Sequence, residues 1–417
     1  MNRELIIKVT NILKNYKICS ICIGRLFYHP SFKNLIKFGK ALKIEALKNL
    51  KEPVKSDRPC YLCNNTFIKF KKEIPSLISK IQAYEFDSIY TSIKVPKKLI
   101  LHEDEIRVRF QISSGESIKQ TFNRLFSNYI AKKLGKIAKS KDYHLMISFD
   151  AEKNQIELIP QNIYIYGRYI KSKKGLSQTR SYCYVCYGKG CSECDYTGYD
   201  KAPSVEGYIL PHFTSAFQAQ KSIFHAAGRE DIDVLTLNEG RPFIVEVVRP
   251  IKRKVNLSEL EKVVNTNSDG AVFVKNLIEV NRDAVKKMTV FTRYDEKTYV
   301  LLVEFEKEIG DDILFKIEKE LTNRVIVQRT PTRVLHRRKD KYRYKMIYDV
   351  KAKKIDNNKA ELHIRCQGGL YIKELAHGDN GRTNPNIAQI ANTNVKVLSL
   401  NIISIAPDLE KKLEIIH

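Results

Sequence analysis

Gly228-Arg229-Glu230-Asp231-Ile232-Asp233-Val234, followed by Gly240-Arg241-Pro242-Phe243, is the most informative stretch of this 417-residue chain. The stretch places the Asp231 carboxylate on a tight turn between an arginine and a second acidic residue. A carboxylate held on such a turn can act as a nucleophile. A charged surface turn is the alternative interpretation, because a Gly-Arg-x-Asp tetrapeptide alone is weak support for a catalytic motif.

The composition of the chain predicts a polyanionic partner. There are 73 lysines and arginines against 47 aspartates and glutamates, a formal charge of +26, which is typical of proteins that bind nucleic acid. A membrane surface is the other possibility, but we find no long apolar run, no signal peptide and no lipidation motif. We therefore expect a cytoplasmic protein with no membrane partner. With 43% hydrophobic residues the chain can form the cores of two or three domains.

Eight of the nine cysteines fall in four Cys-x-x-Cys pairs. These are Cys19 with Cys22, Cys60 with Cys63, Cys183 with Cys186, and Cys191 with Cys194. In a reducing cytoplasm such pairs indicate metal or redox sites rather than disulfides. The last two pairs are only four residues apart and are accompanied by glycines, so they predict one structural zinc. The first two pairs are separated by 37 residues and predict a second, shared zinc.

The ligand set also indicates what these metals would do. Because all eight ligands would be thiolates, we expect closed, four-coordinate zinc sites that hold the fold and take no part in the chemistry. An iron–sulfur cluster is the alternative for either site. Cys366 stands alone on a predicted strand, where a buried and inert thiol is the simplest interpretation.

The first part of the sequence predicts an accessory domain over residues 1–175. Apolar residues at helical spacing predict a first helix that leads directly into Cys19 and a later helix over residues 116–140. Alternation predicts two strands at 144–149 and 155–159. The later helix should turn inward Ile118, Phe122, Leu125, Phe126, Tyr129, Ile130, Leu134 and Ile137. Its lysines are either a solvated face or a stripe that faces RNA.

Residues 176–417 predict a second domain of strands mixed with a few helices. The boundary is set near residue 175, where the sequence is polar and lacks periodicity. Strands are predicted at 243–248, 299–305, 341–345 and 361–366. The densest basic patch comprises Arg333, His336, Arg337, Arg338, Lys339, Lys341, Arg343 and Lys345. Tyrosines interleaved with these cations favour contact with RNA over an ordinary charged sheet surface.

A second glycine-rich region lies closer to the C-terminus. It reads Gly368-Gly369-Leu370-Tyr371-Ile372-Lys373-Glu374-Leu375, followed by His377-Gly378-Asp379 and Gly381-Arg382-Thr383-Asn384-Pro385-Asn386. Two glycines before a strand-like Leu-Tyr-Ile, and a glycine-rich loop after it, suit a backbone that must approach a ligand closely.

These motifs, with Lys297-Thr298-Tyr299 between them, resemble in their order those of the archaeal and eukaryotic tRNA pseudouridine synthase family called Pus-ten. The resemblance covers most of residues 160–400. A helix and strands that end in Ile-Tyr-Ile-Tyr-Gly-Arg-Tyr-Ile-Lys resemble a THUMP-type RNA-binding module, which this family also carries. The implied fold is α+β: a mixed antiparallel-sheet pseudouridine synthase domain at 176–417, and a zinc-bearing, THUMP-like α/β RNA-binding domain at 1–175.

The resemblance also implies roles for seven residues of the site. Asp231 would be the nucleophile that acts on a flipped-out uridine, and Lys373 would pair with it and keep it ionised. Tyr299 would lie against the uracil and relay the proton from C5, and Tyr371 would line the pocket. Arg229 would contact the RNA backbone or occupy the space left by the flipped base. Ile372 and Leu400 would supply apolar packing. Each tyrosine could instead be a core aromatic. At the position before Tyr371, where the family often has threonine or another small residue, this chain has Leu370.

The implied substrate is tRNA, modified at the adjacent uridines 54 and 55 of the T loop. The isomerisation is redox-neutral, so no organic cofactor and no nucleotide or methyl-donor cosubstrate is expected, and the protein is expected to be a monomer. A THUMP-bearing RNA methyltransferase or thiolation enzyme is one alternative, although no Gly-x-Gly-x-x-Gly unit or phosphate-binding loop is found. A non-catalytic, zinc-bearing RNA-binding protein is the other.

Overall fold

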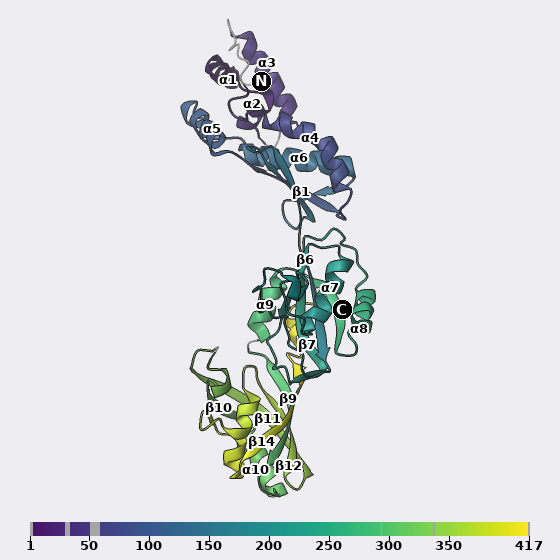
Figure 1. Cartoon of the computed structure of the whole chain (residues 1–417). Coiled ribbons are helices and arrows are strands. Elements are labelled where there is room, and N and C mark those ends of the chain that lie inside the picture. Colours follow the sequence, from purple (N-terminus) through teal and green to yellow (C-terminus); the bar gives the residue numbers. More distant parts are fainter. Residues whose placement is uncertain (1–2, 30–33, 51–58, 293, 337, 416–417) are drawn as a thin grey trace. The chain divides into compact units, whose positions relative to one another are not determined.

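The computed structural model describes residues 3–29, 34–50, 59–292, 294–336 and 338–415. The chain divides into two compact units, Met1–Gln161 and Asn162–His417. Both units combine helices with a sheet, so the fold class is mixed α/β (Figure 1). Over the described ranges, no helix is both long enough and apolar enough to cross a membrane.

The first unit begins with helices that surround the first four cysteines. They are α1 (Arg3–Asn15), α2 (Ser20–Leu26), α3 (Leu35–Lys48) and α4 (Thr66–Ile81). The prediction that the first helix leads directly into Cys19 is wrong, because α1 ends at Asn15 and Cys19 is the N-cap of α2. The helices share one core with the sheet that follows them, so the cysteine region is part of the unit and not an appendage.

A sheet of four described strands completes the first unit. Its order is β2 (Ile137–Ala138), β1 (Ser88–Lys94), β3 (Leu145–Asp150) and β4 (Gln155–Pro160). Strand β1 runs parallel to β2 and β3, whereas β3 and β4 are antiparallel. The two helices α5 (Lys97–Arg109) and α6 (Ile118–Leu134) follow β1, and α6 packs on it (Figure 1). The two strands predicted around the turn at 152–154 are thus confirmed.

Helix α6 is shorter than the sequence predicts. A capping box between Ser117 and Gln120 begins it, and Gly135 ends it in a left-handed conformation with φ of 64°. Ile137, expected to turn inward, lies in β2 and is 59% exposed, and Tyr129 is 46% exposed. The prediction for these two residues is therefore wrong: Tyr129 lies on the exposed face of α6, and the helical period has already stopped at Gly135 before Ile137.

The second unit is organised around a ten-stranded sheet. Among the described residues the order is β13-β10-β11-β12-β9-β14-β7-β5-β8, and β6 pairs with β7. The strands are β5 (Ile163–Lys171), β6 (Lys221–Ala226), β7 (Leu235–Val248), β8 (Val272–Val280), β9 (Glu296–Phe305), β10 (Arg324–Arg329), β11 (Tyr342–Asp356), β12 (Lys359–Gln367), β13 (Thr383–Asn384) and β14 (Val395–Ile405). Only β14 and β7 pair in parallel among these strands.

Helices cover parts of this sheet. They are η1 (Ser192–Cys194), α7 (Val205–Ala216), α8 (Leu257–Thr266), α9 (Asp283–Thr292), α10 (Asp311–Leu321), η2 (Thr332–Val334), α11 (Ile372–His377), α12 (Ile387–Ala391) and α13 (Leu409–Lys412). Helix α10 packs on β11 (Figure 1), and α11 packs against β14. The four strands predicted from apolar runs and alternation lie in β7, β9, β11 and β12 and are confirmed.

Two features of the second unit differ from the sequence analysis. Strand β5 pairs with both β7 and β8, so the unit begins at Asn162 and not near residue 175. The segment Leu370–Ile372 is not a strand, because Tyr371 is the N-cap of helix α11. Cys366, by contrast, is fully buried on β12, as predicted.

Candidate active site and metal centres

A pocket of about 430 Å³ in the second unit collects the predicted site residues. It is lined by Arg229, Asp231, Tyr299, Tyr371, Ile372, Lys373 and Leu400, together with Lys297, Arg333, Arg338, Lys341, Arg343 and neighbouring residues. Seven positions that span 171 residues of sequence, from 229 to 400, therefore meet around one cavity. Arg337, which belongs to the predicted basic patch, lies outside the described residues.

The Asp231 turn connects β6 to β7 and is fixed by a buried lysine. The backbone N–H of Val234 donates to the Asp231 carbonyl at 3.1 Å and closes the turn. Lys171, which is fully buried, donates from Nζ to the carbonyls of Leu176 at 2.7 Å, Ile232 at 3.1 Å and Asp231 at 3.2 Å. These bonds hold the backbone of the turn, so the Asp231 side chain is free to face the pocket.

Glu230, the neighbouring carboxylate, points into the protein. Its Oε2 lies 2.7 Å from Nε of Arg241, and both side chains are fully buried. The Tyr169 hydroxyl donates to Glu230 at 2.9 Å, and Gln178 Nε2 donates to the Gly228 carbonyl at 2.9 Å. Arg241, the arginine of the Gly240–Phe243 motif, thus neutralises the buried Glu230 carboxylate behind the Asp231 turn.

Asp231 faces two cations. Its Oδ2 lies 3.0 Å from Nη1 of Arg333 and 3.7 Å from Nζ of Lys373. Lys373 lies closer to Asp233, donating to both of its carboxylate oxygens at 2.7 and 2.9 Å. Burial raises the pKa of Asp233, but the hydrogen bond and charge of Lys373, with the charge of Arg333, together outweigh it, and the net pKa lies below its usual value. Lys373 therefore bridges the two aspartates, and Arg333 is the nearer partner of Asp231.

Arg333 is the main site residue whose position sequence reasoning missed, since it was assigned only to a basic patch. It lies on η2, and its Nε donates to the buried carboxylate of Glu374 on α11 at 2.6 Å. Its guanidinium also lies 5.9 Å from the centre of the Tyr371 ring, and that of Arg343 lies 5.5 Å from it. Arg333 thus joins the Asp231 turn to the second glycine-rich region. No local pattern marks this role, which depends on a contact across 41 residues.

Tyr299 lies on β9 at the bottom of the pocket, paired in register with Ile364 and Ile402. It is 8% exposed, and burial raises the pKa of its hydroxyl well above the ordinary value. The phenol therefore stays protonated at neutral pH. Lys297, two residues earlier, projects to the same side of the strand and lines the same pocket. Burial, with Arg241 close by, lowers the pKa of Lys297 to about 8.

The first four cysteines come together as the spacing predicts. Cys19, Cys22, Cys60 and Cys63 offer sulfurs that all lie within 4.8 Å of one another, with Cys19 and Cys63 at 3.8 Å. The backbone N–H of Cys19 donates to Cys60 Sγ at 3.3 Å, which favours a thiolate. Tetrahedral bonds of about 2.3 Å to zinc would place sulfurs about 3.8 Å apart, so the arrangement fits this ion.

The second four cysteines form a similar group. Cys183, Cys186, Cys191 and Cys194 have three sulfur pairs at 3.8 Å. The N–H groups of Gly190 and Gly198 donate to sulfur at 3.2 and 3.3 Å. A Cβ on Gly198 would lie only 2.6 Å from the Gly188 carbonyl, so the close turns require glycine. Both groups could hold a metal ion.

Comparisons with known proteins identify the family. A family model described as "Pus10, C-terminal" matches residues 164–406, the region that contains the ten-stranded sheet and the pocket. The protein named tRNA pseudouridine synthase Pus10 of Methanocaldococcus jannaschii is 37% identical over 94% of this chain and 93% of its own. Those of Thermofilum pendens and Pyrococcus furiosus are each 33% identical, over 94% and 97% of this chain and 94% and 98% of their own.

These matches mark the chain as an isomerase of the pseudouridine synthase class. Within that class, it belongs to the tRNA pseudouridine synthase Pus10 family. Among solved structures, a Cbf5-Nop10-Gar1 complex superimposes on 58% of the chain and 49% of its own with a TM-score of 0.32, at 14% identity. A structure of pseudouridylate synthase covers 65% of this chain and 75% of its own with a TM-score of 0.21, at 15% identity.

Proposed function

We propose that this protein converts uridine to pseudouridine at positions 54 and 55 in the T loop of tRNA, with Asp231 as the nucleophile. The observation that carries the proposal is the placement of Asp231 in a pocket between Arg333 at 3.0 Å and Lys373 at 3.7 Å, with the buried Tyr299 among the lining residues. The two cations lie beside the carboxylate oxygens, and the ionised carboxylate is the form that can attack carbon. The relatives named tRNA pseudouridine synthase supply the substrate class.

The proposed isomerisation proceeds in steps that use different residues of the pocket. Asp231 acts on the ribose carbon C1′ of a uridine that has been flipped out of its stack, and the N1 glycosidic bond breaks. The detached uracil turns in the pocket and rejoins C1′ through C5, which breaks the bond between C1′ and Asp231 and releases the carboxylate. The proton lost from C5 is balanced by the proton gained at N1, so no oxidant or donor is consumed. Tyr299, whose hydroxyl is protonated, relays the C5 proton: its oxygen accepts this proton as its own proton passes on toward N1 of the uracil.

The other lining residues would hold the substrate in place. Tyr371 stands under the Arg333 and Arg343 guanidinium groups, which keeps its ring at the wall of the pocket. Ile372 and Leu400, at 3% and 7% exposure, offer apolar surface to the base. Arg229 is exposed at the rim, where it can meet the RNA backbone.

The most direct test maps pseudouridine in an unmodified tRNA transcript after incubation with the purified protein alone. We expect the modification at uridines 54 and 55 with no methyl donor and no ATP. Methylation or thiolation that requires either compound would favour the methyltransferase or thiolation alternative. Binding without any modification would favour the non-catalytic alternative. The THUMP-like role of the first unit, the monomeric state and the cytoplasmic location stay predictions.

The two cysteine groups are assigned to structural zinc. Thiolate ligation of zinc contributes on the order of 10 kcal/mol to folding. We therefore expect two zinc ions per chain in the wild type and one in Cys191→Ser, with a large loss of stability in the second unit. Cys366→Ala is the control, because Cys366 belongs to neither group and should leave the metal content unchanged. Iron with visible absorbance would assign a cluster instead, and a folded protein without metal would contradict the assignment.

A further inference from the structure

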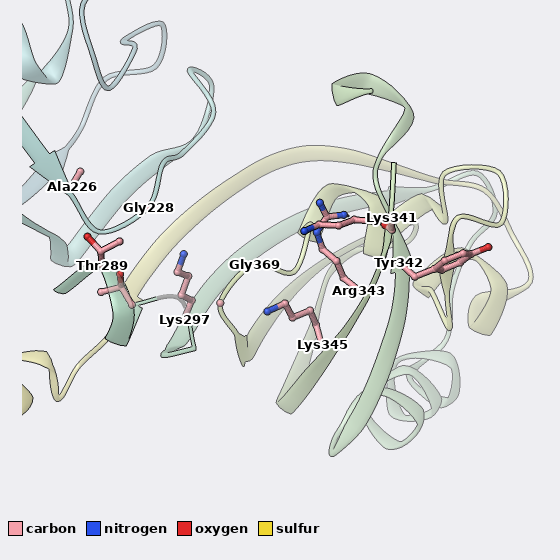
Figure 2. A pocket seen from close by; sticks show the side chains of 11 residues that line it. Ala226, Gly228, Thr289, Lys297, Lys341, Tyr342, Arg343, Lys345 and Gly369 are labelled. Atoms are coloured by element: carbon pink, nitrogen blue, oxygen red, sulfur yellow. Dashed lines mark hydrogen bonds between the residues drawn. The ribbon is translucent and has the colours of Figure 1, made fainter. Parts of the chain in front are cut away.

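A second pocket, of about 500 Å³, adjoins the candidate active site (Figure 2). The two share Gly228, Lys297, Lys341, Arg343 and Gly369 as lining residues. The second pocket extends beyond them to Lys345 on β11 and to Thr289 and Thr292 on α9. A substrate in the first pocket can therefore continue into the second without leaving the protein surface.

The second pocket is strongly cationic. Arg343 and Lys345 alternate along β11 and so project to the same side, Lys341 directly precedes this strand, and Lys297 comes from β9 on the other wall. Figure 2 shows the charged ends of Lys341, Arg343 and Lys345 directed toward the side on which Lys297 lies. No aspartate or glutamate is among the described residues that line this pocket.

Lys297 is the cation that most clearly lacks a counter-charge. Within the part of the chain that the structure describes, no carboxylate forms an ion pair with its ammonium, whereas the nearby Arg241 is already paired with Glu230. Burial, together with the nearby charges of Arg241 and Lys345, lowers the pKa of Lys297 to about 8, against the opposing effect of Cys366 and Glu230. A half-buried cation close to other cations is costly unless an anion arrives.

We propose that the second pocket binds a backbone phosphate of the substrate RNA next to the flipped uridine, and that Lys297 is the cation that the phosphate and the catalytic pocket share. The proposal rests on the proposed function, because the RNA must enter the first pocket to reach the second. A phosphodiester fits the site because it is anionic, has oxygens for several donors at once, and is linked by the ribose to the base in the first pocket. The bound phosphate also supplies the charge that Lys297 lacks.

The proposal is tested with tRNA assembled from synthetic halves, in which one phosphate at a time is replaced by an uncharged methylphosphonate. Neutralising the linkage next to the target uridine should weaken binding to the wild type about tenfold, as expected for one charge-assisted contact. Lys297→Met should show a similar loss with all phosphates present, a salt slope smaller by about 0.7, and no additional loss with the neutral linkage. Lys262→Met is the control, since Lys262 lies on α8 and pairs with Glu259 at 2.8 Å.

Binding should also depend on pH in a way that Lys297 controls. Because free Lys297 loses its proton as the pH rises through about 8, the wild type should lose affinity between pH 7 and 9, and Lys297→Met should lose much less. Lys345→Met provides a second variant should Lys297→Met fail to fold. The neutral linkage can also be combined with each lysine variant. If the fold-losses in affinity from the linkage and from the variant simply multiply in both combinations, the proposal is overturned. Wild-type pseudouridine formation on unmodified tRNA, measured in parallel, reports the proposed function independently.

Discussion

The two faces of the turn at 228–234 hold adjacent carboxylates in opposite surroundings. Glu230 points inward, where it is fully buried against Arg241. Asp231 points outward, where its side chain is 33% exposed and meets Arg333 and Lys373. The comparison teaches that the same kind of ion pair can serve two purposes. The inner pair has fully buried side chains and supports the fold, whereas the outer carboxylate is partly exposed in the pocket and can react.

Lys171 and Lys373 extend this comparison to the lysines. Lys171, on the inner face, gives all of its hydrogen bonds to backbone carbonyls and so fixes the turn. Burial lowers its pKa. Lys373, on the outer face, is bonded to Asp233 and lies near Asp231, so it can adjust when a substrate arrives. The inner face therefore holds the backbone of the turn that carries Asp231 into the pocket.

Removal of the inner charge should have the largest effect on stability. Glu230→Gln keeps the shape of the side chain but leaves the Arg241 guanidinium buried without a counter-charge, which should cost about 3–5 kcal/mol. The measurement is denaturant unfolding of the full chain, followed with a probe of the second unit. Asp233→Asn is the matched control, because its side chain is 60% exposed and exposed pairs contribute about 0–1 kcal/mol. Equal losses in the two variants would contradict the distinction between the faces.

Removal of the Tyr299 hydroxyl should affect the chemistry and not the fold. Proton transfer by a placed side chain contributes about a hundredfold to ten-thousandfold, so Tyr299→Phe should slow tritium release from C5-labelled uridine by a factor in that range. Affinity for tRNA should stay within a few fold of the wild type. Tyr164→Phe is a suitable control, because this tyrosine is also buried but bonds to Glu246 on another part of the sheet. Similar rates for both variants would remove Tyr299 from the mechanism.

A change at Arg333 should have a smaller effect on the same rate. Arg333→Lys keeps the positive charge but cannot contact Asp231 and Glu374 together, so we expect turnover to fall about tenfold to a hundredfold. Arg365→Lys is the control, since it alters an exposed pair with Glu296 at 2.9 Å. Single-turnover tritium release at saturating tRNA separates this loss from weaker binding. An unchanged rate would show that Lys373 alone is sufficient beside Asp231.

The sequence predicts the parts of this site better than their contacts. Spacing predicts the cysteine groups, an apolar run predicts β9 and alternation predicts the start of β11, because each depends on a local pattern. The role of Arg333 depends on a contact between η2 and α11 that no local pattern encodes. The end of α6 was misjudged because the apolar spacing continues to Ile137 although the backbone turns at Gly135. Lys373 lies near both Asp231 and Asp233, and these two contacts likewise depend on the conformation of the folded turn.

The central claim is that Asp231, and not its neighbour Asp233, is the nucleophile. Asp231→Asn keeps the size of the side chain and removes its charge, so we expect tritium release from C5-labelled uridine in tRNA to fall by more than about a thousandfold. Affinity for tRNA should stay within a few fold, and Asp233→Asn should retain measurable turnover. Wild-type release by Asp231→Asn together with none by Asp233→Asn would assign the nucleophile to Asp233. Full activity of both variants would contradict the account of the site.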